Sequence, residues 1–151
     1  MKRNVLLACF ALLALSGCDE AVKEKPQAQA VSEVPSLSTS DDGQQVVTFK
    51  DGASITLKGK LIRNVVFSND SGKFQRYIFE LDEQSMAIEG RVFATIVKAG
   101  YQRKVKTSNA DTYAVHYQKR GYPAVGATYA NLEGGKGDAA AKTRLTLLWR
   151  I

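Results

Sequence analysis

The chain has 151 residues, of which 44% are hydrophobic and 24% are charged, and its formal net charge at pH 7 is +6. This length corresponds to about one domain, at roughly 150 residues per domain. The ordinary globular composition excludes a wholly disordered, collagen-like or multi-span membrane protein. We therefore expect a single hydrophobic core.

The first residues have the pattern of a secretory signal peptide. Lys2 and Arg3 supply positive charge, and residues 5–15 form an apolar run. This run is too short to span a bilayer, which takes about 20 apolar residues, but it suits the apolar region of a signal peptide. Residues 1–17 are therefore predicted to be removed from the mature chain.

The apolar run ends in Leu15-Ser16-Gly17-Cys18, which resembles the lipobox of bacterial lipoprotein precursors. The resemblance implies cleavage before Cys18, a diacylglycerol on its sulfur, and acylation of the new amino group. Two or more acyl chains anchor a protein stably to a membrane, whereas one chain binds only marginally. The alternative is an ordinary secretory signal in which Cys18 occurs by chance. No family is assigned to the mature domain from its sequence.

The residues around Cys18 also bear on location and redox chemistry. In enterobacterial lipoproteins, an Asp in the position of Asp19 is associated with retention in the inner membrane. The resemblance thus implies a periplasm-facing anchor in the cell envelope, with the inner membrane favoured over the outer. Because Cys9 leaves with the signal and Cys18 carries lipid, we expect no disulfide, cysteine nucleophile or Cys-ligated zinc.

Composition divides the rest of the chain into a linker, residues 18–45, and one domain, residues 46–151. The linker has no aromatic residue and carries six acidic and two basic residues, a net charge of −4. The domain carries 17 Lys and Arg against 9 Asp and Glu, a net charge of +8. A basic domain suits an acidic protein, an acidic glycan or anionic lipid, and export argues against nucleic acid. Alternatively, the excess is solubility charge scattered over the surface.

Alternation of apolar and polar residues predicts the strands of this domain. The predicted strands are residues 46–49, 54–62, 77–81, 101–106, 112–118, 124–132 and 145–151. Residues 133–141, which contain three glycines, are expected to form a flexible loop.

The hydrophobic period changes between Asp82 and Ala99, which predicts one helix there, capped by Asp82 or Ser85. Its expected apolar face contains Met86, Ile88, Val92, Phe93, Ile96 and Val97. Gly90, in the middle, suggests close packing against a sheet or a misplaced boundary. The order of elements predicts an α+β fold: a small antiparallel sheet of about five to seven strands with one main helix packed on one face.

The sequence contains few residues or motifs that indicate catalysis. No hydrolase, zinc-protease or phosphate-loop motif is present. His116 is the single histidine, and a lone His on a strand is more typical of packing or surface. Asp82, Glu83 and Glu89 could pair as in glycosidases, but acids near a helix start are explained by the helix dipole. We predict no catalytic residue, no metal and no cofactor.

Basic and aromatic residues gather on two strands that are neighbours in the chain. They are Tyr101, Arg103, Lys104, Lys106, Tyr117, Lys119, Arg120 and Tyr122. If the strands pair, these side chains would lie near one edge, and Tyr and Arg are residue types that carry binding energy at interfaces. This set is therefore the predicted partner-binding patch. Alternatively, Tyr and Lys serve only as ordinary residues of an exposed sheet edge.

The sequence therefore predicts a non-enzymatic lipoprotein that binds an acidic protein or another envelope component. An immunity protein against a periplasmic toxin would form a tight one-to-one complex. An accessory subunit would instead co-purify with a multi-protein assembly. The alternative from another class is an enzyme acting on peptidoglycan, whose turnover would depend on Glu89 or His116.

Lipidation can be tested directly. We expect radiolabelled palmitate to be incorporated into the protein, and mass spectrometry of the processed chain to find Cys18 acylated, because its thiol is the nucleophile in diacylglycerol transfer. A bare sulfur at Cys18 in the processed chain would contradict the lipobox interpretation.

Overall fold

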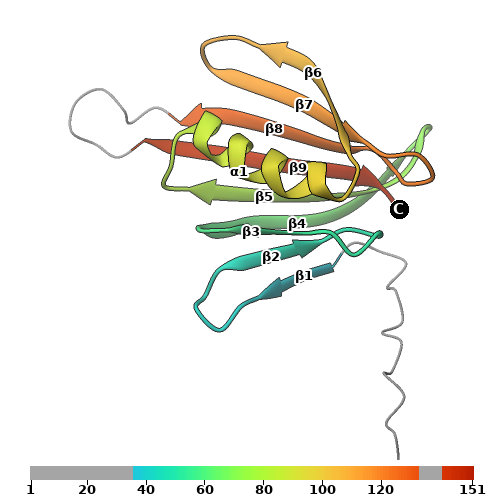
Figure 1. Ribbon diagram of the computed structural model, residues 1–151, viewed down its shortest axis with the longest axis horizontal. Coiled ribbons are helices and arrows are strands. Elements are labelled where there is room, and N and C mark those ends of the chain that lie inside the picture. The colour runs from blue at the N-terminus through green and yellow to red at the C-terminus, as the bar shows by residue number, and fades with distance from the viewer. Residues whose placement is uncertain (1–35, 133–140) are drawn as a thin grey trace, which may run out of the picture.

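The computed structural model describes residues 36–132 and 141–151, which form two antiparallel sheets and one helix (Figure 1). The lipobox and residues 133–140 lie outside the described residues. The smaller sheet has the strand order β1-β2-β3, from β1 (Ser36–Thr39), β2 (Gln45–Thr48) and β3 (Ser54–Leu57). Each of these strands pairs with the next through a short turn.

The larger sheet has six strands in the order β4-β5-β9-β8-β7-β6. Its strands are β4 (Lys60–Asn69), β5 (Gly72–Leu81), β6 (Gln102–Ser108), β7 (Thr112–Gln118), β8 (Val125–Leu132) and β9 (Lys142–Arg150). The last strand, β9, lies between β5 and β8 and joins the hairpin before the helix to the meander after it. The broad α+β prediction is thus confirmed, but the strands form two sheets instead of one.

One face of the six-stranded sheet, which we call the inner face, carries most of the core. Alternate residues of β5 and β9, including Tyr77, Phe79 and Leu147, are buried there. Trp149 packs edge-on against Tyr77, with ring centroids 5.1 Å apart, and against Phe49, at 6.2 Å. Since Phe49 follows β2, these contacts join the small sheet to the large one in a single core.

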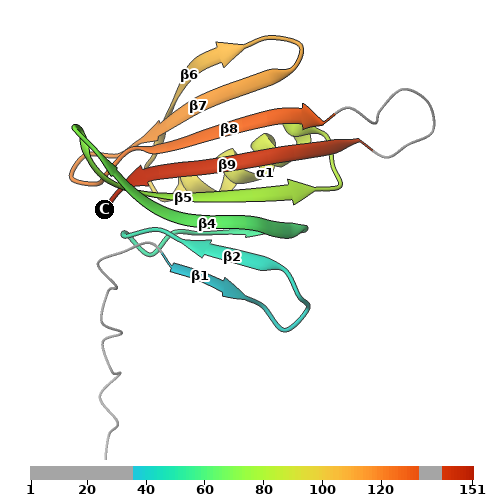
Figure 2. The same ribbon diagram turned by 180° about the vertical axis from the view of Figure 1, so that it is seen from behind.

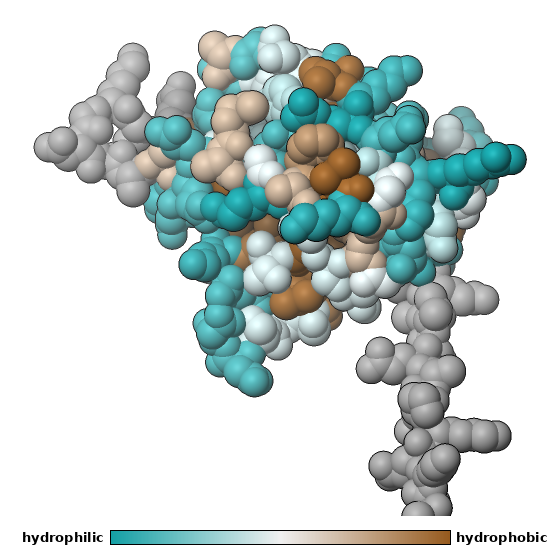
Figure 3. Space-filling model, in the orientation of Figure 1, coloured by the Kyte–Doolittle hydropathy of each residue, from teal (hydrophilic) through white to brown (hydrophobic). Residues whose placement is uncertain are grey.

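The helix α1 (Ser85–Lys98) lies over the inner face and comes closest to β3, with looser packing on the six-stranded sheet. Ile88, Val92 and Ile96 are its buried apolar residues. Two residues of the predicted apolar face, Met86 and Val97, are instead exposed. Figure 3 shows apolar side chains surfacing among polar ones on this side of the molecule.

The start of α1 differs from the prediction. The helix begins after Gln84, without a side-chain cap and without an acid in its first turn. Asp82 and Glu83 precede the helix and form ion pairs with Lys142 and Arg91 instead. Their position is therefore explained by ion pairing, and the prediction that Asp82 or Ser85 caps the helix is wrong.

Several boundaries of the predicted strands also change; β5, for example, begins at Gly72 instead of at residue 77. Residues 36–39, assigned to the linker, form β1 and pair with β2. The single strand expected over residues 54–62 is divided at Gly59 into β3 and β4, which belong to different sheets. A Cβ at Gly59 would collide with the backbone carbonyl of Glu80, so a glycine lets the chain pass close to β5 here.

Within the described parts of the chain, no helix is long and apolar enough to cross a membrane.

Gly90 offers a test of the helix packing. The residue is exposed, and a Cβ added there would meet nothing within 4 Å, so close packing against a sheet does not explain it. Gly90→Ala is expected to raise the free energy of unfolding by about 1 kcal/mol, the difference in helix propensity between the two residues. Urea denaturation of the purified protein measures this change.

Gly59→Ala is the contrasting variant, because its Cβ has no room, and it is expected to lower the free energy of unfolding. A loss of stability in Gly90→Ala would show that the helix packs differently from the structure described here.

Candidate functional site

The face of the six-stranded sheet opposite α1, which we call the outer face, is not covered by any described element (Figure 2). Directly paired residues of antiparallel strands point to the same face, so the register defines the outer face as rows across the sheet. The central row contains Val65, Arg76, Leu148, Gly126, His116 and Lys104. The next row contains Arg63, Ile78, Thr146, Thr128, Ala114 and Thr107. The outer face is thus mixed, with bases toward its edges and with small residues at its centre beside the apolar Ile78 and Leu148.

The outer face is strongly basic. Its paired rows carry seven bases: Lys60, Arg63, Arg76, Lys104, Lys142, Arg144 and Arg150. Glu80 is the one acidic residue in these rows, and its carboxylate accepts a 3.0 Å hydrogen bond from Arg144. Lys142 pairs with Asp82, which precedes the helix, and among the described residues the other five bases form no salt bridge. Unpaired positive charge therefore accumulates on this uncovered side of the sheet.

A hollow of about 250 Å³ lies at the centre of the outer face, over β5, β7, β8 and β9. Its floor contains Ala114 and Gly126, whose small size leaves the space. Its polar lining consists of Arg76, His116, Thr128 and Thr146. None of these four side chains hydrogen-bonds another side chain of the described residues, and the guanidinium of Arg76 stacks 4.5 Å from the ring centroid of Phe67. The hollow therefore presents several polar groups that are free to bind a ligand.

His116 lies at one side of this hollow, beside Gly126 and opposite Lys104 in the register. Partial burial lowers the pKa of the imidazole below its ordinary value, and the nearby charges of Lys106 and Lys104 lower it further. His116 is consequently neutral at pH 7, with one ring nitrogen able to donate and the other able to accept.

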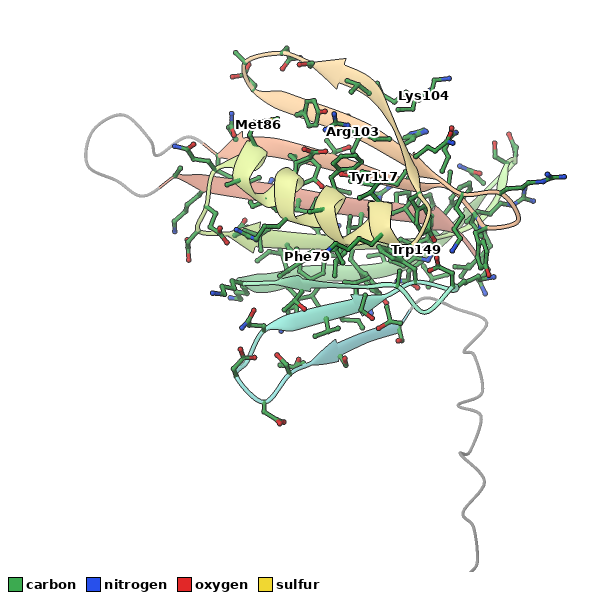
Figure 4. The ribbon with its side chains drawn as sticks, viewed as in Figure 1. Phe79, Met86, Arg103, Lys104, Tyr117 and Trp149 are labelled. Atoms are coloured by element: carbon green, nitrogen blue, oxygen red, sulfur yellow. The ribbon has the colours of Figure 1, made fainter. Side chains whose placement is uncertain are left out.

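The structure does not bring the eight residues of the predicted patch onto one surface. Tyr101 and Tyr117 are buried in the core, with exposed fractions of 3% and 1%, so neither offers its side chain to a partner. Arg103 pairs with Tyr117 on the inner face, whereas Lys104 pairs with His116 on the outer face. Figure 4 shows Arg103 directed toward the helix and Lys104 directed away from it.

The remaining members of the patch are also divided. Lys119 forms a 2.6 Å ion pair with Asp51, whose side chain is buried, and its ammonium lies 4.8 Å from the ring centroid of Tyr122. Lys106 falls in the bulge between Val105 and Thr107, and Arg120 lies in the exposed turn after β7. Of the predicted patch, Lys104 and Lys106 thus lie near His116, while Lys119 is engaged elsewhere.

Arg103 instead belongs to a buried network between α1 and the sheet. Its guanidinium donates to Glu89 Oε1 at 3.1 Å and stacks over Phe93, with the ring centroid 4.5 Å away. The hydroxyl of Tyr117 donates to the same oxygen at 3.3 Å and lies 3.2 Å from the hydroxyl of Tyr129. Burial raises the pKa of both phenols, so both are protonated at neutral pH. Glu89, only 3% exposed, is thus held by two groups, Arg103 and Tyr117, and links the helix to β6 and β7.

The residues considered for catalysis do not converge. His116 points to the outer face, whereas Glu89 is buried between α1 and the inner face. Glu83 and Asp82 are paired with Arg91 and Lys142. In the two described stretches, no group of three or more His, Cys, Asp or Glu side chains could hold a metal ion.

Comparisons with known proteins found no match: no family model, no curated protein and no solved structure.

Sequence reasoning missed the outer face as a site. The signal that could have found it is the alternation itself, because the polar residues between the apolar residues of β5 and β9 include Arg76, Arg144 and Arg150. The alternation does not indicate the order of the strands in the sheet. Only the pairing of β5 and β7 with β9 and β8 brings Arg76 and His116 into one row.

The buried network can be tested with neighbouring residues on opposite faces. Arg103→Ala leaves the Glu89 carboxylate without its counter-charge and is expected to lower the free energy of unfolding by about 2 kcal/mol. The expected loss is smaller than for a fully buried pair because Arg103 is partly exposed. Lys104→Ala is the control and should change stability by no more than about 0.5 kcal/mol. Urea denaturation measures both.

In the Arg103→Ala background, Glu89→Gln should recover part of the loss, because an amide needs no counter-charge. Equal stability of Arg103→Ala and Lys104→Ala would contradict the role assigned to the network.

Proposed function

We propose that this chain is a lipid-anchored, non-enzymatic protein of the bacterial cell envelope that binds an acidic protein partner through the outer face of its six-stranded sheet. The observation that carries the proposal is the charge of that face, with seven bases and one acid in its paired rows. Complementary charge steers partners together and disfavours wrong ones, because like charges in contact are costly. A basic face of this kind favours an acidic protein surface.

The anchor and the compartment in this proposal rest on Leu15-Ser16-Gly17-Cys18 and Asp19. The resemblance to a lipobox supports a domain held at the periplasmic face of a membrane, with the inner membrane favoured. An acidic subunit of an envelope complex and an acidic toxin that reaches the periplasm are both partners of the required chemistry. The first corresponds to an accessory role and the second to an immunity role.

The arrangement of the carboxylates supports binding over peptidoglycan hydrolysis. Glycosidases need two carboxyl groups facing one bond, about 5–9.5 Å apart. Here Glu89 is buried in an ion pair, and His116 lies on the other side of the sheet. No specific observation on the described residues favours the enzymatic alternative.

Charge reversal on the outer face tests the proposal. The double variant Lys104→Glu/Arg150→Glu is expected to reduce capture of the partner at least about tenfold, since each change replaces attraction with repulsion. Full-length, acylated protein in intact cells is cross-linked, the bound proteins are identified by mass spectrometry, and the amount of each is compared between variants. The capture by the parent protein should fall as salt rises.

The matched control is Lys58→Glu/Lys98→Glu, which alters net charge equally but away from the outer face. It should retain the partner, and circular dichroism should be unchanged in both variants. If both variants lose the partner equally, or if the captured protein is basic, the proposal is overturned. A one-to-one complex would indicate immunity, and an assembly of several proteins would indicate an accessory role.

A further inference from the structure

The central hollow of the outer face contains polar groups that suit a small anion, and these lie among apolar side chains that include Ile78 and Leu148. Arg76 supplies a positive charge, Thr128 and Thr146 supply hydroxyl donors, and His116 supplies a ring nitrogen. The two threonines are directly paired across β8 and β9, so their side chains leave the same face of neighbouring strands. No acid lies in either of the two rows that cross the hollow.

Size limits what the hollow can take. Sites for drug-sized molecules measure roughly 300–1,000 Å³, and this hollow, at about 250 Å³, is smaller. It matches one side chain projecting from a partner better than a free metabolite. A Cβ at Gly126 would lie 3.5 Å from the carbonyl oxygen of Leu148 and 3.7 Å from the His116 ring, so a larger residue there would reduce the space.

We propose that this hollow binds a carboxylate side chain of the acidic partner, with Arg76, Thr128 and Thr146 as donors, and that His116 gains a proton when the carboxylate binds. This inference rests on the proposed function and specifies its site. Arg76 and the threonines neutralise and hydrogen-bond the carboxylate, since charge-assisted hydrogen bonds of this kind are stronger than neutral ones. The surrounding bases attract the rest of the acidic segment.

Proton uptake follows from the charges around His116. The groups facing it are Lys104 and Lys106 on β6 and Arg76 across the row on β5, while β8 and β9 contribute the uncharged Gly126 and Leu148. In the free protein, partial burial and the positive charges of Lys106 and Lys104 oppose protonation of the ring and lower its pKa. A bound carboxylate places a negative charge beside the ring and raises the pKa of His116. Binding therefore takes up a proton, and the affinity should rise as the pH falls from 7.5 to 5.5, where glutamate side chains remain ionised.

Because the chain has a single histidine, its imidazole resonance reports on this site without assignment ambiguity. The mature, acylated protein is held in neutral detergent micelles, and the His116 proton resonances are followed by NMR between pH 5 and pH 8. The probe is a deca-glutamate peptide, with deca-glutamine as its uncharged control. We expect the titration midpoint to lie below 6.5 without peptide and to move upward with deca-glutamate alone.

A shift of one unit in the pKa of His116 corresponds to a tenfold difference in the affinity for the carboxylate between the protonated and the neutral ring. We therefore expect deca-glutamate to bind at least about threefold more tightly at pH 5.5 than at pH 7.5. His116→Gln should remove this pH dependence. Thr128→Val/Thr146→Val should abolish the midpoint shift, while Thr56→Val, an equivalent change on β3, should leave it intact.

The outcomes separate this inference from the proposed function. If deca-glutamate binds through the outer face but leaves the His116 midpoint unmoved, the carboxylate site is overturned and the basic face remains the binding surface. If vesicles containing phosphatidylglycerol move the midpoint and deca-glutamate does not, the ligand is a lipid headgroup and the inference is also overturned. Failure of the charge-reversal test in cells, in contrast, removes the proposed function itself.

Discussion

A six-stranded sheet has two faces, and the described residues of this chain provide a covering layer for one of them. The helix and the three-stranded sheet cover the inner face and bury Phe79, Leu147 and Trp149. The outer face must remain compatible with water, so its strands place arginine, lysine and threonine between the core residues. Such a face keeps the backbone hydrogen bonds of the sheet while presenting charge. The distribution of charge in the molecule follows from this one-sided burial.

Ion pairing then decides which bases remain available. Acidic residues near the inner side each engage a base: Asp51 with Lys119, Glu89 with Arg103 and Glu83 with Arg91. Asp51 and Glu89 are buried, and a buried carboxylate without such a partner would be strongly destabilising, so Lys119 and Arg103 have structural roles. Among the described residues, the positive charge left without an acidic partner includes five bases on the outer face. The outer face therefore carries a substantial share of the unpaired positive charge, and bases such as Lys58 and Lys98 lie elsewhere on the surface.

The sequence predicted local structure well where the period is regular. Alternation placed strands within residues 112–118 and 145–151, which correspond closely to β7 and β9. The helix was correctly located, and Ile88, Val92 and Ile96 of its predicted apolar face are buried, but the rest of its buried side was not predicted. Glu89 is buried because Arg103 and Tyr117 reach it from strands distant in the sequence, and no local pattern records that contact. Met86 and Val97 are exposed because the small sheet and the large one meet the helix along another side.

The eight residues of the predicted binding patch do not share one surface, for the same reason. Tyr101, Tyr117 and Arg103 were assigned to the surface because tyrosine and arginine are common at interfaces. A single strand places neighbouring residues on opposite faces, so Arg103 and Lys104 cannot both belong to one patch on the sheet. The sequence indicated a basic domain correctly, but which bases share a face depends on strand order, which is set by long-range pairing.

The two parts of the outer face contribute differently to binding. Solvent-exposed ion pairs are each worth only about 0–1 kcal/mol and weaken with salt, so the basic rim mainly raises the rate of encounter and orients the partner. Selectivity must come from groups that lose water on binding, because leaving such groups unpaired is costly. The half-buried hydroxyls of Thr128 and Thr146 and the ring of His116 are groups of that kind. If acyl chains hold the protein at the membrane that carries its partner, the raised effective concentration allows modest contacts on the rim to suffice. The discrimination between acidic partners would then depend on what enters the hollow.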